Sequence, residues 1–161
     1  MRGGATPPAL LFAALGLALA FAPREAWIPS LLAVLLTLMA LLFLPVPHEW
    51  LDGVFLGCWI SVIATAATVY LGRRMNALAA LVLSVNAGLW ASAVIRLSGS
   101  PLDAIKALPW LLTLWPASWA MNRYGSIPSR VVSSWLVAIA ALAAVLQFLP
   151  VTPGYLPDHL E

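Results

Sequence analysis

Six long apolar runs dominate the chain, and charged side chains occur only near their ends or between them. The runs cover residues 9–22, 27–44, 50–71, 77–95, 107–121 and 128–149. A helix of about 20 apolar residues can cross a bilayer, because all of its backbone polar groups are bonded within the helix. The pattern therefore predicts an all-α, polytopic membrane helix bundle of about six transmembrane helices, forming a single domain over residues 1–161.

The composition agrees with a membrane protein and excludes several other classes. Hydrophobic residues make up 63% of the chain and charged residues 9%, whereas soluble domains average about 45–50% and about 25%. The net charge is +2 and the longest basic run is Arg73-Arg74, which argues against a nucleic-acid partner. A single cysteine, Cys58, excludes an internal disulfide and a cysteine-based metal cluster.

The first apolar run imitates a secretory signal, because Arg2 precedes it and small residues end it. Pro23 would follow the cleavage position and is expected to block cleavage. We therefore expect residues 9–22 to be retained as a short, Ala-rich helix that depends on packing against its neighbours.

The fifth run is the least regular, since Pro116 removes a backbone hydrogen bond and is expected to kink residues 107–121. A five-span bundle with this run re-entrant or interfacial is the alternative. Residues 97–106 precede it as a polar connection with a possible short amphipathic helix. Residues 150–161 contain two prolines and no apolar run, which predicts an extended tail.

Residues 50–96 are predicted to form a helical hairpin in which each arm carries a stripe of small residues four apart. The stripes are Gly53, Gly57, Ser61 and Thr65 on the first arm, and Ala80, Ser84, Gly88 and Ser92 on the second. Helices in lipid associate through close packing of small residues and interhelical hydrogen bonds. If the chain reverses near Arg74, Ser61 lies opposite Gly88 and the two stripes are in contact along their length. We expect this hairpin to be the packing nucleus.

The loop charges predict an orientation. With the connections after the first, third and fifth helices in the cytoplasm, five arginines lie inside and three basic residues outside, as the positive-inside rule favours. The five are Arg24, Arg73, Arg74, Arg123 and Arg130, and the three are Arg2, Arg96 and Lys106. Both termini are then expected on the non-cytoplasmic side of a bacterial inner membrane.

Most catalytic chemistries lack the residues that they need. Intramembrane acidic or basic side chains usually mark proton and ion pathways, and here they lie in loops or at helix ends. The two histidines, His48 and His159, lie in a proline-rich loop and in the tail, so no haem and no other cofactor is expected. His48, Glu49 and Asp52 are close in sequence, but a solvated start of the third helix is preferred over a metal site, because both carboxylates suit the positive end of the helix dipole.

Asn86 is the most informative buried polar residue, because a carboxamide within the bilayer needs a hydrogen-bond partner. It either bonds to a neighbouring helix, which is preferred, or lines a substrate path. The candidate groove comprises Asn86, Trp90, Trp115, Pro116 and Trp119, although packing of the last two tryptophans against another helix is favoured.

These observations favour a non-enzymatic subunit, scaffold or assembly factor of a larger membrane complex, with the bilayer and other membrane proteins or further copies of itself as partners. The alternative is a small oligomeric transporter or channel for a neutral or lipid-like substrate. An enzyme that acts on a lipid through His48, Glu49 and Asp52 is the third possibility.

Overall fold

The computed structural model describes residues 5–42, 47–70, 75–98 and 100–147. Their α-helices are α1 (Thr6–Leu19), α2 (Trp27–Leu42), α3 (Leu51–Tyr70), α4 (Ala77–Ser98), α5 (Pro101–Ala107), α6 (Leu114–Tyr124) and α7 (Ile127–Leu146). Three 3-10 segments accompany them, η1 (Arg24–Ala26), η2 (His48–Trp50) and η3 (Leu108–Thr113). The described residues contain no strand, which confirms the predicted all-α bundle. The tail predicted over residues 150–161 lies outside this part of the chain.

Four helical segments are long and apolar enough to cross a membrane. They are Arg24–Leu42, Leu51–Tyr70, Ala77–Leu97 and Ile127–Leu146. α1 is apolar but has 14 residues, so it is about 21 Å long, against a hydrocarbon core of about 30 Å. The protein is thus a helical membrane protein with four helices of spanning length among its described residues, where the sequence suggested about six.

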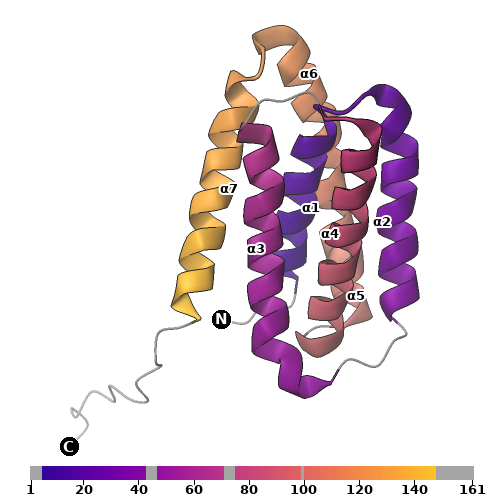
Figure 1. Cartoon of the computed structure of the whole chain (residues 1–161), viewed down its shortest axis with the longest axis vertical. Coiled ribbons are helices and arrows are strands. Elements are labelled where there is room, and N and C mark those ends of the chain that lie inside the picture. The colour runs from indigo at the N-terminus through magenta and orange to yellow at the C-terminus, as the bar shows by residue number, and fades with distance from the viewer. Residues whose placement is uncertain (1–4, 43–46, 71–74, 99, 148–161) are drawn as a thin grey trace, which may run out of the picture.

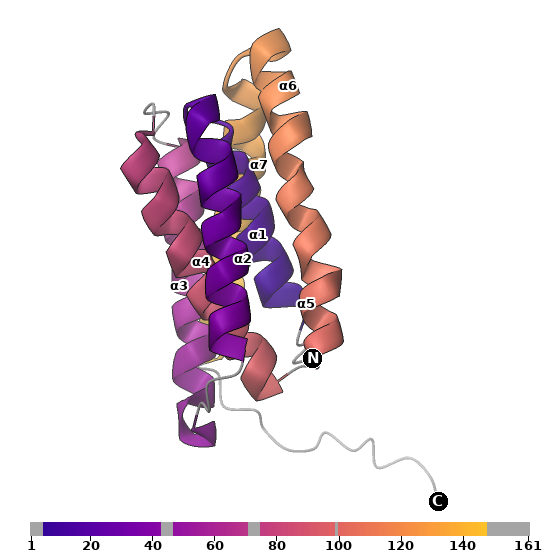
Figure 2. The ribbon, with the colours of Figure 1, turned by 90° about the vertical axis from the view of Figure 1, so that its right-hand side faces the viewer.

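The short helix α1 forms the core of the bundle. Leu11, Phe12, Leu15 and Leu19 have no exposed surface, and α1 contacts α3, α4, η3 and α6. Figure 2 shows it between α4 and α6. The packing nucleus is therefore α1 with the helices around it, and the expectation that the 50–96 hairpin fills this role is wrong. The alanine and glycine residues of α1 have small side chains or none, which lets several helices approach its backbone closely.

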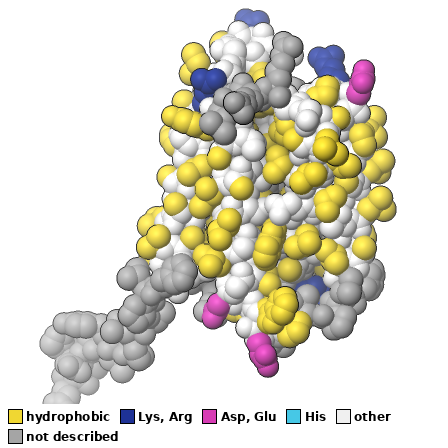
Figure 3. Space-filling model, in the orientation of Figure 1, with side chains coloured by type: hydrophobic (Ala, Val, Ile, Leu, Met, Phe, Trp, Pro, Cys, Tyr) yellow, Lys and Arg dark blue, Asp and Glu magenta, His cyan; other side chains and the backbone are white. Residues whose placement is uncertain are grey.

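The helices α2 and α7 pack on the outside of this core. α2 lies along α4 and α7 lies along α3, and these are the two most extensive helix contacts. Each outer helix buries a narrow face, formed by Val34 and Leu38 on α2 and by Leu136 and Ala140 on α7. Their remaining apolar side chains are exposed, as the yellow surface between the two charged ends of the molecule illustrates (Figure 3). This is the arrangement expected of lipid-facing helices.

The helical irregularity lies just before Pro116, the residue that was expected to kink this run. Residues 108–113 wind as the 3-10 segment η3, and α6 begins at Leu114. Pro116 thereby falls in the first turn of α6, where the backbone N–H groups have no partner within the helix and a missing one costs little.

The break at η3 allows the chain to approach α1 closely. The Thr113 hydroxyl donates a hydrogen bond to the Trp110 carbonyl at 2.8 Å and lies 3.2 Å from the Ala13 carbonyl of α1. A Cβ atom on Gly16 would lie only 3.0 Å from the Leu114 nitrogen and 3.1 Å from the Leu111 oxygen. The glycine is therefore required for this contact between two backbones.

The connections between helices gather at two ends of the bundle (Figure 1). At one end the Met75 backbone N–H donates to the Phe21 carbonyl at 3.2 Å, which joins the connections after α1 and before α4. At the other end α5 is the predicted short amphipathic helix, with Asp103 and Lys106 in an ion pair of 3.5 Å. The start of α1 and the end of α7 both lie at this second end (Figure 1).

Candidate functional site

A cavity of about 810 Å³ lies at the second end of the bundle, between the end of α2, the start of α3 and the later half of α4. Its lining residues are Leu41, Pro47, Glu49, Trp50, Gly53, Val54, Leu89, Trp90, Ser92 and Ala93. We call this space the α3–α4 cavity. Small-molecule sites are typically apolar clefts of about 300–1,000 Å³, often between the helices of a bundle.

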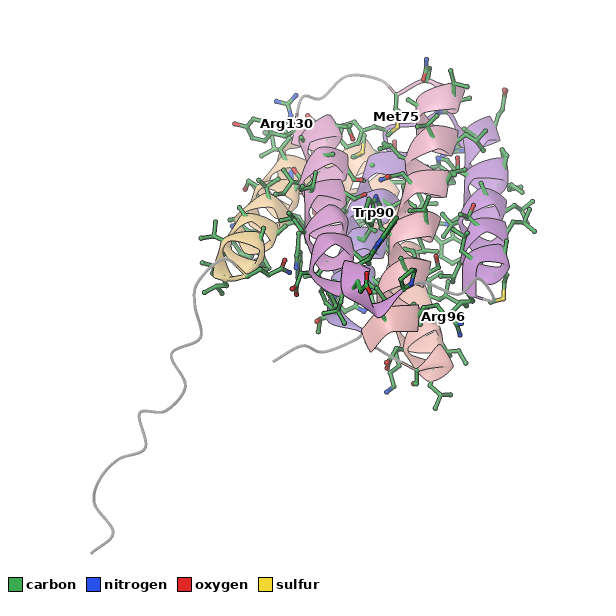
Figure 4. All side chains as sticks on the ribbon, turned by 60° about the horizontal axis from the view of Figure 1, so that its bottom comes forward. Met75, Trp90, Arg96 and Arg130 are labelled. Carbon is green, nitrogen blue, oxygen red and sulfur yellow. The ribbon has the colours of Figure 1, made fainter. Side chains whose placement is uncertain are left out.

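A smaller space of about 390 Å³ continues along the surface of α3. Its lining residues are Leu56, Gly57, Ile60, Ser61, Ala64 and Asn86, together with Gly53 and Trp90. The last two residues line both spaces. We call the smaller space the upper groove. The indole of Trp90 lies between α3 and α4, where the upper groove meets the α3–α4 cavity (Figure 4).

Trp90 is held in place by a hydrogen-bonded chain that joins the two helices. Its indole N–H donates to the Asn86 side-chain oxygen at 3.1 Å, and the Asn86 amide donates to the Ser61 hydroxyl of α3. The predicted interhelical partner of Asn86 is thereby identified, and Asn86 also borders the upper groove. Its role in a substrate path stays a prediction.

The two small-residue stripes do not face each other along their length. Gly57 lies against the ring of Trp90, and Ser61 is bonded to Asn86. A Cβ atom on Gly88 would meet the Val34 oxygen and the Thr37 Cβ of α2, each at 2.9 Å. The predicted pairing of Ser61 with Gly88 is therefore wrong. Residues two apart on a helix point about 200° apart, so α4 cannot present Asn86 and Gly88 to the same neighbour.

The other stripe residues occupy separate surroundings. Gly53 is exposed, and an added Cβ atom there would meet nothing within 4 Å. Thr65 and Ala80 are buried in the bundle. The Ser84 hydroxyl donates to the Ala80 carbonyl at 2.8 Å, and the Ser92 hydroxyl donates to the Leu89 carbonyl at 2.7 Å. The stripe on α3 therefore borders open space along part of its length.

The predicted groove residues divide into two places. Trp90 borders both the α3–α4 cavity and the upper groove, and Asn86 borders the upper groove, whereas Trp115, Pro116 and Trp119 lie exposed on α6. Trp115 is 66% and Trp119 61% exposed, and the Trp119 ring contacts Tyr124 edge-on at 6.0 Å. The structure therefore does not assemble these five residues into one groove.

Glu49, which was predicted to lie in a solvated helix start, lines the cavity together with Trp50. Among the described residues of the lining Glu49 is the charged side chain, and Asp52 lies exposed in the first turn of α3. Among the described residues no group of three histidine, cysteine or acidic side chains could hold a metal. The side chain of His48, and all of His159, lie outside what the structure describes. The cavity is thus an apolar space with one carboxylate at its lining.

Three of the five arginines that predict the orientation lie within the described residues. Arg24, Arg123 and Arg130 are at the first end of the bundle, near the connections that Figure 3 shows with basic side chains. Arg73 and Arg74 lie outside the described residues.

Comparison of the chain with protein-family models, with curated proteins and with solved structures gave no match. The long apolar helices define a helical membrane protein.

Replacing Asn86 with leucine is expected to lower the free energy of unfolding by about 1–2 kcal/mol, because it removes an interhelical hydrogen bond and leaves the Ser61 hydroxyl and the Trp90 N–H without their partner. Thermal unfolding in detergent measures this loss. Asn122, exposed on α6, is the matched control, and equal losses for Asn86→Leu and Asn122→Leu would contradict the assigned role.

Proposed function

We propose that this protein acts without chemistry of its own, as a subunit, scaffold or assembly factor of a larger membrane complex. The observation that supports this most directly is the exposed aromatic face of α6, formed by Trp115 and Trp119 with Leu112 beside them. The short connections leave the membrane-embedded surfaces as the main place for recognition. Exposed tryptophans are the side chains that most often supply binding energy at protein interfaces.

Anchoring at the membrane interface is the ordinary role of an exposed tryptophan, but it accounts poorly for Trp115. Arg123 lies in the last turn of α6, and Trp115 is eight residues before it, or about 12 Å along the helix. A side chain at that depth is expected in hydrocarbon, where a second helix can cover it. The partners are therefore other membrane proteins or further copies of this chain.

Purification from native membranes in a mild detergent, followed by native mass spectrometry, tests this proposal. We expect partner subunits in fixed stoichiometry with the wild-type chain, and their loss from the Trp115→Ala, Trp119→Ala double variant. Trp135 is 68% exposed on α7, so Trp135→Ala is the matched control and should keep the partners. A wild-type chain that is monomeric and free of partners would overturn the proposal.

A transporter or channel for a neutral or lipid-like substrate is the second candidate, and the α3–α4 cavity is the observation that favours it. Such a site needs an apolar lining with a few polar groups, which Glu49 and Ser92 supply in the α3–α4 cavity. A homo-oligomer that carries solute or lipid and no foreign subunit would favour this function in the same experiment.

We further propose that the protein resides in a bacterial inner membrane with both termini on the non-cytoplasmic side. Within the described part of the chain, the first end of the bundle carries Arg24, Arg123 and Arg130 with Glu25, whereas the second end carries three carboxylates with Arg96 and Lys106. The positive-inside rule places the first end in the cytoplasm. A reporter that is active only in the cytoplasm should be silent when fused after Glu161, and strong activity would reverse this orientation.

A further inference from the structure

We propose that the α3–α4 cavity binds the alkyl chain of a single-chain amine amphiphile, with the amine at Glu49 and the end of the chain against the indole of Trp90. This inference goes beyond the complex-subunit function and does not rest on it.

The lining suits an alkyl chain. Apart from Glu49 and Ser92, it consists of aliphatic side chains, Gly53 and the two indoles of Trp50 and Trp90, and the Ser92 hydroxyl is already bonded to the Leu89 carbonyl. Moving an alkyl chain from lipid into an apolar cavity changes its free energy little, so the fit between the chain and the shape of the cavity must favour binding. The atoms that line an unfilled space lack dispersion contacts on one side, and an alkyl chain that fills the space restores those contacts.

The position of the charge suits an amine head group. Glu49 belongs to η2 at the bundle end, next to the start of α3, and borders the cavity. Glu49 is exposed, so its carboxylate can attract a cationic head group that stays at the aqueous end of the cavity. A neutral head group of equal size gains no such attraction.

A partner helix fits this space less well than a flexible chain. A helix with its side chains is 10–12 Å across, so about 810 Å³ accommodates roughly two turns of it. A spanning partner needs about 20 residues, whereas the cavity occupies one end of the bundle. An occupant that enters from the bundle end and stops inside is therefore favoured.

Trp90 sets the length of the occupant. Its ring occupies the space beside Gly57, between the α3–α4 cavity and the upper groove, and Asn86 fixes its orientation. With the ring in place, the chain ends at the indole. Removing the ring joins the cavity of about 810 Å³ to the groove of about 390 Å³.

Native mass spectrometry of the purified full chain with added dodecylamine, octadecylamine or dodecanol tests the proposal. The wild type should bind dodecylamine more tightly than both other compounds. Trp90→Ala should raise the affinity for octadecylamine relative to dodecylamine by about tenfold, which corresponds to about 1.4 kcal/mol. Glu49→Gln should abolish the preference for the amine over dodecanol without changing the preference for length.

An added Cβ atom at Gly53 meets nothing within 4 Å, so the Gly53→Phe variant should fold. Its phenyl ring should fill the cavity and remove most of the dodecylamine binding. Ala138 is exposed on α7, and Ala138→Phe should bind as the wild type does. Equal binding by Gly53→Phe and the wild type would overturn the site, and an unchanged length preference in Trp90→Ala would overturn the role of Trp90. A protein partner found cross-linked at Gly53 in native membranes would replace the amphiphile as the occupant.

Discussion

Replacing Gly16 with leucine is expected to prevent stable assembly of the bundle. The added side chain would overlap the Thr113 hydroxyl and lie near the Leu114 nitrogen and the Leu111 oxygen. The backbone atoms cannot turn aside as a flexible side chain can, so α1 and η3 must separate. Alanine alone should cost about 1–3 kcal/mol through overpacking, and leucine should lower the amount of folded protein in the membrane several-fold. Thermal unfolding and the yield of monodisperse protein measure the two effects.

Gly53 provides the matched control, because it is also a helix glycine and an added Cβ meets nothing within 4 Å. Gly53→Ala should leave stability unchanged or raise it by up to about 1 kcal/mol, since alanine favours a helix over glycine. If Gly16→Ala and Gly53→Ala proved equally stable, the close approach of η3 to α1 would be refuted.

Leu15→Ala is expected to be the second most damaging of these substitutions. Leu15 has 0% of its side chain exposed in the middle of α1, where the contacts of several helices meet. Leucine-to-alanine changes in protein cores cost about 2–5 kcal/mol. The separated helices of a membrane protein stay in lipid, so the free energy of transferring the side chain out of the core contributes little. We therefore expect Leu15→Ala to lower the free energy of unfolding by about 2 kcal/mol through lost packing.

Leu142→Ala makes the same chemical change on α7, where 63% of the side chain is exposed. Its cost should stay within about 0.5 kcal/mol, as for most surface substitutions. Thermal unfolding of both variants in one detergent gives the comparison. A larger loss for Leu142→Ala would mean that α7, and not α1, carries the core.

Hydrophobic pattern and turn residues predicted the helices well, because both are local properties. α3 and α4 span Leu51–Tyr70 and Ala77–Ser98, against predictions of 50–71 and 77–95. The proline in the first turn of α7 marks its start as predicted. The pattern does not distinguish a central helix from a peripheral one, because in lipid both are apolar all round. This is why the packing of α1 against its neighbours was expected, but its central position was not.

The contacts of α4 show what spacing alone cannot decide. Asn86 and Gly88 both suggested interhelical packing, and their separation requires that they face different helices. The sequence contains no information about which of them faces α3. Hydrogen bonding of Asn86 to Ser61 and of Trp90 to Asn86 settles this, and it leaves Gly88 against α2.

The α3–α4 cavity was only partly predictable for the same reason. Asn86 and Trp90 were candidates because they are a polar and an aromatic residue on one helix face. Glu49 and Trp50 lie just before α3, whereas Trp90 lies on α4. Only the packing of α3 against α4 brings these residues to the same space. Trp115 and Trp119 share the chemistry of Trp90 but lie on α6, away from the cavity lining.

Photolabelling from within the bilayer shows whether a membrane-embedded bundle surrounds α1. A small apolar photoreactive probe is dissolved in vesicles that contain the full chain, and the labelled residues are mapped by mass spectrometry. We expect labels on the exposed faces of α2, α6 and α7, for example at Leu36, Trp115 and Leu142, and none at Phe12 or Leu15. Labelling of Phe12 and Leu15 as strong as that of Leu142 would contradict the central position of α1.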